Sequence, residues 1–419
     1  MFIPPAETPC PPPDGPLRAR VVRANDDVAT ALVGLLRGTT LDVPNGLQVR
    51  RIELQDDIPA GHKFAVQALD VGLRIRKYGE CIGRLTRDVP AGGWVHLHNL
   101  ETSALHDPRQ ALAWDQAPYC GPGSTELQTL GNVLCSVGEN PLYDAALDRL
   151  YWIDVRDTPA IHAVDLGDGA QHTWPMREDI GSIALAGAGR LLVALRSGFA
   201  FFDVARGVLQ PIVDPEPGLT HNRLNDGRCD AAGRYWCGSM NPESGTADGS
   251  LYVLEPDLSC RKVLDGYFTP NGITWSLDGA TLYVADTRRG LIQAHAFDVA
   301  TGTVSAPRVF ADLGALPGGP DGATLDAEGF LWSAQIDGGC LVRYAPDGAI
   351  ERVLRLPVSR PTSCAFGGPG WRQLFVTTAT RGLDVHELRA QPLAGRVLVL
   401  DVGVAGLPPM PFLPAAAPA

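Results

Sequence analysis

The chain has 419 residues, and its 47 Asp and Glu outnumber its 35 Lys and Arg, which gives a net charge of −12. This charge argues against nucleic acid or an anionic membrane surface as a partner. The length is sufficient for two domains. The 47 Gly and 35 Pro, with charged residues at only 20%, favour many turns and short strands over long helices.

Nothing in the sequence indicates export or membrane insertion. No stretch approaches the roughly 18 apolar residues that a membrane span requires. The first residues show neither the basic region nor the apolar region of a secretory signal. The nine cysteines have scattered spacings and form no Cys-x-x-Cys pair, which indicates reduced, mostly buried thiols. We therefore expect a cytoplasmic protein.

The first quarter of the chain predicts a small β domain. Short strands alternate with Pro-Ala-Gly turns, as in "IPAGHKFAV" and "VPAGGWVHLHNL". We expect a flexible start over residues 1–16, this domain over 17–103 and a linker over 104–125. His96 and His98 either share one face of a strand, as metal ligands do, or stand partly exposed in a turn at its end.

A repeat dominates the rest of the chain. Apolar strand cores recur with starts 41 to 49 residues apart: "LYWID", "LLVAL", "YWCGSM", "LYVAD", "LWSAQ" and "LFVTT". Such a period is typical of a four-stranded propeller blade of about 40 to 50 residues. The sequence therefore predicts a mainly β protein with a six-bladed β-propeller over residues 126–408. The Pro/Ala-rich residues 409–419 predict a disordered tail.

When the six units are aligned on their turns, one residue of each unit falls at an equivalent position. The aligned residues are Glu139, Gly181, Asn225, Asn271, Asp321 and Thr362. In four units a short polar residue follows five positions later: Asp144, Asp230, Ser276 and Asp326. Because the innermost strand of each blade borders the central channel, we expect the aligned residues to converge there.

Two carboxylates and two amides in this ring predict a site for a hard cation. Ca²⁺, Mg²⁺ and Mn²⁺ prefer oxygen ligands, and the ring contains neither His nor Cys. In the alternative interpretation, Asn and Asp before Gly simply form turns. Asp347, in the Pro-Asp-Gly at 346–348, is interpreted in this second way.

Several phrases in order resemble one family. "GENP", "RLNDGRCDAAGRYWCGSM", "FTPNGITWSLDGATLYVADT", "GGPDGATLDAEGFLWSA" and "LPVSRPTSCAFGG" are similar to the gluconolactonase and senescence-marker-protein family of sugar lactonases, over residues 130 to 408. The resemblance implies one divalent metal ion, which is Ca²⁺, Zn²⁺, Mn²⁺ or Mg²⁺. It places the metal ligands at Glu139, Asn271 and Asp321. Asn140 departs from the Gly of many members.

The resemblance also implies the substrate contacts. Arg223 and Asn225 take the substrate-binding positions of the family's Arg-x-Asn-Asp-Gly phrase, and Glu243 matches a further residue that contacts sugar hydroxyls. A metal at the ring acts as a Lewis acid on the lactone carbonyl. Asp321 is the expected base that takes a proton from water. No Gly-x-Ser-x-Gly motif supports a serine-esterase route.

The front domain resembles another family. "GHKFA", "KYGE-x-IG" and "VHLHN" are similar to the SAF (β-clip) domain of altronate and galactarate dehydratases. We expect hydrolysis of an aldono- or aldarolactone in carbohydrate catabolism, with the front domain linked to sugar-acid dehydration. A separate dehydratase subunit is then a candidate partner, since we do not expect this chain to dehydrate alone. The alternatives are a non-catalytic sugar-acid-binding scaffold and an accessory subunit of such a dehydratase.

Overall fold

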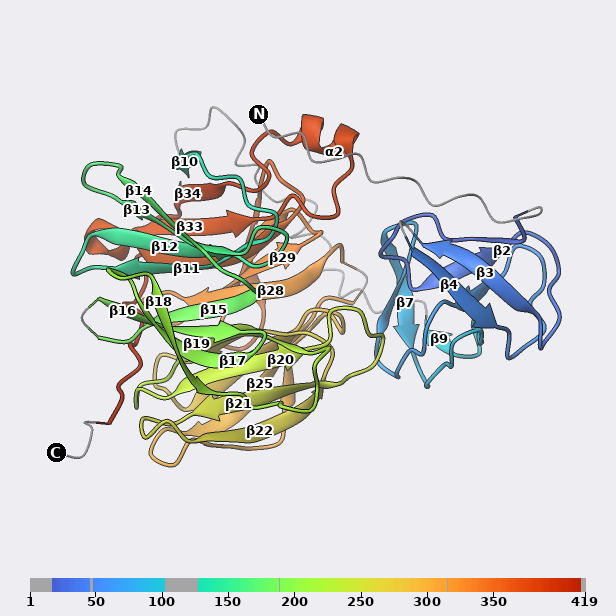
Figure 1. Cartoon of the computed structure of the whole chain (residues 1–419), viewed down its shortest axis with the longest axis horizontal. Coiled ribbons are helices and arrows are strands. Elements are labelled where there is room, and N and C mark those ends of the chain that lie inside the picture. Colours follow the sequence, from blue (N-terminus) through green and yellow to red (C-terminus); the bar gives the residue numbers. More distant parts are fainter. Residues whose placement is uncertain (1–16, 46–47, 102–126, 188, 315, 416–419) are drawn as a thin grey trace. The chain divides into compact units, whose positions relative to one another are not determined.

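The computed structural model describes residues 17–45, 48–101, 127–187, 189–314 and 316–415. The chain divides into two compact units, and the division falls in the stretch 102–126 outside the described residues. The expected flexible start and the expected linker also lie outside them. Strands make up nearly all of the regular structure described (Figure 1).

The front unit is a small β domain, and its described residues form nine short strands. They are β1 (Ala19–Arg20), β2 (Val28–Ala31), β3 (Thr40–Asn45), β4 (Gln48–Glu53), β5 (Lys63–Ala65), β6 (Arg74–Lys77), β7 (Glu80–Leu85), β8 (Trp94–Val95) and β9 (Leu100–Glu101). They form the sheets β1-β2-β5-β8, β3-β4 and β6-β7-β9. Alternation along β3 buries Leu41 and Val43, which pack in one core with Phe64.

The histidines of the front unit lie in a turn. His96 follows the end of β8, and its backbone carbonyl accepts hydrogen bonds from the N–H groups of Asn99 (3.0 Å) and Leu100 (2.8 Å). His96 is half-buried and His98 is exposed. Both histidines thus lie in a turn at the end of the strand, and their rings stack with centroids 6.3 Å apart. Their role as metal ligands stays a prediction.

The second unit contains the predicted blades. The first three contain β11 (Gly138–Asp144), β12 (Arg149–Asp154), β13 (Ala160–Asp165) and β14 (Gln171–Pro175); β15 (Ile180–Leu185), β16 (Arg190–Leu195), β17 (Gly198–Asp203) and β18 (Val208–Val213); and β19 (Arg223–Cys229), β20 (Tyr235–Met240), β21 (Gly249–Leu254) and β22 (Cys260–Tyr267). The fourth contains β23 (Pro270–Trp275), β24 (Thr281–Asp286), β25 (Leu291–Asp298), β26 (Thr303–Val304) and β27 (Arg308–Asp312). The fifth contains β28 (Gly319–Leu325), β29 (Leu331–Ile336), β30 (Cys340–Tyr344) and β31 (Ile350–Arg355).

The sixth blade joins the two ends of the propeller. Its sheet has the order β10-β34-β33-β32, with β10 (Leu127–Leu130), β32 (Pro361–Gly367), β33 (Gln373–Thr378) and β34 (Val397–Asp401). The first strand of the unit thus completes the last blade, by pairing antiparallel with β34. A 3₁₀ turn η1 (Pro369–Trp371) and the short helix α2 (Val385–Ala390) lie between its strands.

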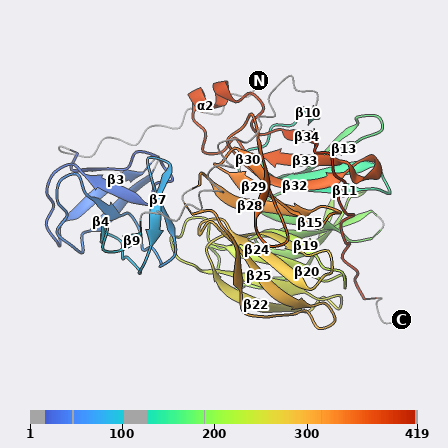
Figure 2. The same cartoon turned by 180° about the vertical axis from the view of Figure 1, so that it is seen from behind.

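The six blades close into a ring. Their innermost strands contact one another in the cycle β11, β15, β19, β23, β28, β32 and back to β11. Figure 2 shows the sheets of this unit from the opposite side. The predicted mainly β fold with a six-bladed propeller is therefore confirmed.

Each blade packs against both of its neighbours through strands that are apolar on both faces. In β12, Tyr151 and Ile153 belong to the core shared with the second blade, whereas Leu150 and Trp152 belong to the core shared with the sixth. Successive side chains of a strand point to opposite faces, so a strand buried on both faces reads as a continuous apolar run. This explains the repeated phrases of the "LYWID" type.

Buried aspartates fasten two of the hairpins that begin a blade. In the fifth blade, Asp326 accepts hydrogen bonds from the indole Nε1 of Trp332 (2.9 Å) and from Nε of Arg343 (2.8 Å). In the third blade, Asp230 accepts from Nε1 of Trp236 (2.9 Å) and Nε of Arg234 (2.6 Å). The polar residue five positions after the ring therefore connects the turn to the next strand.

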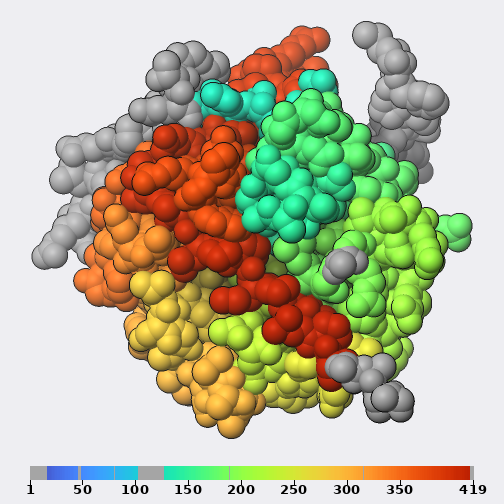
Figure 3. All heavy atoms as spheres, turned by 90° about the vertical axis from the view of Figure 1, so that its left-hand side faces the viewer, coloured from blue at the N-terminus to red at the C-terminus, as the bar shows by residue number. Residues whose placement is uncertain are grey.

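The chain after β34 does not form the expected disordered tail over its described part. Residues 406–415, here called the C-terminal strap, cross one face of the propeller (Figure 3). The N–H of Gly406 donates to the carbonyl of Trp371 (2.8 Å), and the N–H of Phe412 donates to the carbonyl of Leu185 (2.7 Å). Phe412 is fully buried between the second and third blades. This aromatic anchor outweighs the Pro/Ala-rich composition.

Two further expectations concern cysteines and membrane spans. The seven cysteines in the described part of the chain are free thiols, and five of them are buried, as expected. The described residues include no helix with the length and apolar character needed to cross a bilayer.

Candidate functional site

The structure places each ring residue near the start of the innermost strand of its blade. In all six blades the pairing between the first and second strands is irregular at this position. A β-bulge re-aims the side chain that it contains. At each of the six irregularities, the ring residue therefore departs from the regular alternation of side chains between the two faces of the strand.

Gly181 shows how closely the blades approach one another at the ring. A Cβ atom at this position would lie 2.4 Å from the carbonyl oxygen of Leu224 and 2.6 Å from that of Asn225. No side chain fits there, so the second blade contributes only backbone. The ligand-bearing residues of the ring come from the other blades.

Hydrogen bonds determine which way the Asn271 amide faces. The hydroxyl of Thr287 donates to the carbonyl of Pro320 (2.7 Å), so its oxygen can only accept from Nδ2 of Asn271 (2.7 Å). Oδ1 of Asn271 therefore faces away from Thr287, and it accepts a hydrogen bond from Nδ2 of Asn225 (2.7 Å). A second lone pair of this oxygen is available to a cation.

The same network orients Arg223 and Asn225. Nδ2 of Asn225 also donates to the carbonyl of Pro270 (3.0 Å), and its Oδ1 accepts from a terminal nitrogen of Arg223 (2.7 Å). The Nε of Arg223 is buried and has no hydrogen-bond partner. An unpaired buried donor is costly, and a ligand oxygen would satisfy it. Burial lowers the pKa of Arg223 to about 10.

Glu139 is held by the residue that follows it. The N–H of Asn140 donates to Oε2 of Glu139 (2.9 Å), and Oδ1 of Asn140 accepts from the N–H of Ile183 in the second blade (2.7 Å). Asn140 has a φ of 49°, which Asn tolerates better than most residues. This explains why Asn can replace the Gly of many family members here.

The two ring carboxyls are electrostatically strained. Burial raises the pKa of Glu139 well above its ordinary value, and the charges of Asp321 and Asp226 raise it further. Burial also raises the pKa of Asp321, with Asp226 adding to the effect, while Arg360 and Arg223 oppose it. A divalent cation would relieve both desolvation and repulsion. The charges of the site therefore suit a cation.

The donor set also suits a hard cation. The described residues contain no cluster of three or more His, Cys, Asp and Glu side chains suited to a metal ion. A ring site would instead take two carboxylates, from Glu139 and Asp321, and the amide oxygen of Asn271. All-oxygen sets of this kind are typical of Ca²⁺ and Mg²⁺.

Glu243 shows no contact with the ring among the described hydrogen bonds and ion pairs. Glu243 lies in an exposed turn after β20, where its backbone N–H donates to Oδ1 of Asn241 (3.1 Å). None of the described hydrogen bonds or ion pairs joins its side chain to the ring. Its role in binding sugar hydroxyls stays a prediction.

Sequence reasoning missed two residues of the site. Thr287 orients Asn271, and its only sequence signal is its position after the "LYVAD" strand core. Asp226 raises the pKa of both ring carboxyls and follows Asn225 directly in the "RLNDG" phrase. Its own carboxylate accepts hydrogen bonds from the N–H groups of Gly227 (2.9 Å) and Ile273 (3.2 Å).

The raised pKa values predict that the metal-free protein loses stability as the pH rises. Glu139 and Asp321 hold protons in the folded state at pH values where the unfolded chain has released them, so the free energy of unfolding falls between the unfolded and folded pKa values. We expect the melting temperature in chelator to fall from about pH 4 upward, where the carboxyls of the unfolded chain begin to lose their protons. The double variant Glu139→Gln, Asp321→Asn should show a shallower dependence, and identical slopes would contradict this prediction.

A six-bladed propeller with an oxygen-lined ring in its channel is the class of protein that the fold and the site define. The chain belongs to the SMP-30/gluconolactonase/LRE-like family, whose model matches residues 137–380. Residues 18–103 match the altronate/galactarate dehydratase SAF domain. Both resemblances noted in the sequence are thereby confirmed.

Relatives of known name cover the propeller. Regucalcin from Gallus gallus is 33% identical over 296 residues, which are 69% of this chain and 99% of that protein. The 6-deoxy-6-sulfogluconolactonase of Pseudomonas putida is 33% identical over 272 residues, 64% of this chain and 92% of that enzyme. The solved structure of a calcium-binding regucalcin from Agrobacterium tumefaciens has a TM-score of 0.67 at 29% identity, covering 71% of this chain and 99% of the other.

Proposed function

We propose that this chain hydrolyses a sugar lactone to the open-chain sugar acid, with a divalent cation held by Glu139, Asn271 and Asp321. The observation that carries the proposal is the orientation of Asn271, whose amide oxygen faces away from Thr287 and toward the neighbouring ring residue Asn225. Two carboxyls with raised pKa values stand in the same ring. Lactone-hydrolysing relatives with this propeller support the reaction type.

The chemistry divides among few residues. A divalent cation supplies Lewis-acid polarisation of the lactone carbonyl. Asp321 takes a proton from the attacking water. Arg223 binds a hydroxyl or ring oxygen of the sugar through its unpaired Nε. Asn225 has both ends of its amide engaged, and it holds Arg223 and Asn271 in place while leaving one lone pair of Oδ1 for the substrate.

A loop beside this site sets the sugar preference in our proposal. Glu216, in the stretch 214–222, accepts hydrogen bonds from the hydroxyls of Ser239 (2.7 Å) and Tyr252 (2.9 Å) and from Nδ2 of Asn222 (3.0 Å). One carboxylate thus fixes the loop directly before Arg223. A loop held in this way would select among sugars of different shape.

The first experiment measures proton release from pentono-, hexono- and aldarolactones. Chelated protein is compared with the same protein after addition of Mn²⁺, Ca²⁺, Zn²⁺ or Mg²⁺. We expect hydrolysis above the spontaneous rate for one substrate class, lost on chelation and restored by metal. Rates equal to the spontaneous rate for every lactone and metal would overturn the proposal and leave the alternative, sugar-acid binding without turnover.

The front domain extends the proposal to a partner. Its match to a dehydratase domain supports docking of a separate sugar-acid dehydratase subunit, which would consume the acid released by the propeller. Co-purification of such a subunit with the full chain would test this. Co-purification of the subunit should depend on residues 17–101, the described part of the front domain.

A further inference from the structure

A second cavity lies further along the inner strands, beyond the ring. Its volume is about 400 Å³, within the usual range for small-molecule sites. Every blade contributes the residue three positions after its ring residue: Leu142, Ala184, Arg228, Thr274, Thr324 and Ala365. The cavity is thus a separate level of the same channel.

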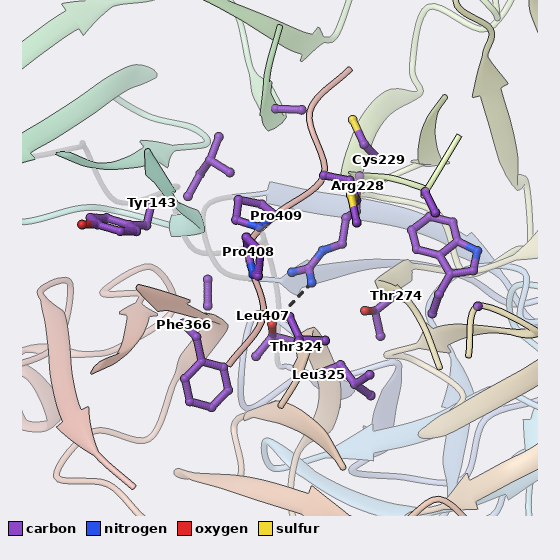
Figure 4. A pocket seen from close by; sticks show the side chains of 18 of the residues that line it. Tyr143, Arg228, Cys229, Thr274, Thr324, Leu325, Phe366, Leu407, Pro408 and Pro409 are labelled. Atoms are coloured by element: carbon purple, nitrogen blue, oxygen red, sulfur yellow. Dashed lines mark hydrogen bonds between the residues drawn. The ribbon is translucent and has the colours of Figure 1, made fainter. Parts of the chain in front are cut away.

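The C-terminal strap forms one wall of this cavity. Residues 407–410 line it, and hydrogen bonds of Gly406 to Trp371 and of Phe412 to Leu185 anchor the strap on both sides. Pro408 and Pro409 have no N–H group, so this wall is short of hydrogen-bond donors. Leu325 and Phe366 add apolar surface (Figure 4).

Arg228 places a positive charge in these apolar surroundings. Figure 4 shows its side chain pointing into the cavity toward Pro408. One terminal nitrogen donates to the carbonyl of Ala323 (2.8 Å), and the other approaches the hydroxyl of Thr324 (3.4 Å). Both acceptors are neutral. A guanidinium has five N–H donors, so these bonds leave donors for an anionic ligand.

Asp226 does not neutralise Arg228 by direct pairing. Asp226 experiences the positive charge of Arg228, which opposes the rise of its pKa caused by burial. Its carboxylate oxygens are nevertheless bound to the N–H groups of Gly227 and Ile273. No ion pair of Arg228 with a carboxylate occurs within the described part of the chain. An incoming carboxylate would therefore find N–H donors of Arg228 that no protein carboxylate occupies.

The lining discriminates against sugars. A sugar acid carries a hydroxyl on almost every carbon, and each hydroxyl buried without a partner costs free energy. Thr274 and Thr324 are the hydroxyl-bearing members of the six-residue level, whereas Leu142, Ala184 and Ala365 are aliphatic. An anion with an apolar body satisfies Arg228 and also covers the aliphatic wall.

We propose that this cavity binds a small organic carboxylate with an apolar body, with its carboxylate on Arg228 and its body against the aliphatic wall and the C-terminal strap. This site is separate from the ring, and it does not depend on the lactonase activity proposed above.

Calorimetric titration of the full chain tests the proposal. Octanoate is compared with 1-octanol, which has the same chain length without the charge, both in the presence of chelator. We expect octanoate to bind at least about tenfold more tightly than the alcohol, because a guanidinium–carboxylate pair in the cavity adds a charge-assisted contact. Equal affinities would overturn the proposal.

Three variants locate the site. Arg228→Gln should weaken octanoate about tenfold and leave 1-octanol unchanged. Ala365→Leu should weaken both ligands by filling the cavity. Arg190→Gln, which removes an exposed arginine packed over Phe201, should change neither. Melting curves confirm folding of each variant. Octanoate binding that survives Arg228→Gln but is lost in Asn271→Ala would place the anion at the ring and refute the proposal.

Discussion

Asp321→Ala is expected to lower kcat/KM for the lactone by about 10³-fold or more, because it removes a metal ligand and the proposed base together. Metal binding should weaken in parallel, since only two of the three proposed ligands, Glu139 and Asn271, remain. Calorimetric titration with Ca²⁺ and Mn²⁺ gives the affinity, and proton release gives the rate. The loss of a buried carboxyl with a raised pKa should not destabilise the metal-free fold.

The chain contains its own matched control. Asp347 stands in a second Pro-Asp-Gly tripeptide with the same sequence as that of Asp321. It lies in an exposed turn, where it accepts a hydrogen bond from the N–H of Ala349 (3.0 Å). Asp347→Ala should leave kcat/KM and metal affinity unchanged. If Asp321→Ala retained near-normal rates while Asp347→Ala behaved identically, the ring would not be the reacting centre.

Asp326→Ala is expected to destabilise the protein by about 3–5 kcal/mol, because it removes a buried acceptor that a guanidinium, an indole and two backbone N–H groups share, although Arg343 keeps its ion pairs with Glu328 and Glu351. The side chains of Asp326 and Arg343 are 0% and 3% exposed, and they lie 2.7 Å apart. The indole of Trp332 and the N–H groups of Glu328 and Phe330 lose the same acceptor. In a scanning-calorimetry trace the melting temperature should fall by roughly 10 °C.

Asp278→Ala is the comparison for this effect. Asp278 stands in the equivalent turn of the fourth blade, but it is exposed and accepts bonds from the N–H of Ala280 and the hydroxyl of Ser276. Surface changes of this kind usually stay within about 0.5 kcal/mol. Equal losses in both variants would show that burial of the charge is not the cause.

The repeat made most of the fold predictable. Six apolar strand cores at similar spacing predicted the six blades, and alignment of their turns placed Glu139, Asn271 and Asp321 at one level of the channel. Equivalent positions of a repeat are equivalent in space, so a pattern in sequence becomes a ring in the structure. The resemblance to sugar lactonases added the roles of these residues.

The remaining features depend on contacts that no local pattern encodes. The function of Thr287 arises because its hydroxyl is committed to Pro320, 33 residues later, which fixes the amide of Asn271. The C-terminal strap was missed because a Pro/Ala-rich composition favours disorder. Its order depends on Phe412, which enters a core between blades far from it in sequence.

The pairing of β10 with β34 also sets when the propeller can form during synthesis. β10 ends at Leu130 and β34 begins at Val397, so at roughly 5–20 residues per second the ribosome needs on the order of ten seconds to a minute between them. The front domain can fold during this delay. Until β34 emerges, the first strand of the propeller has no partner, and an unpaired strand edge favours aggregation.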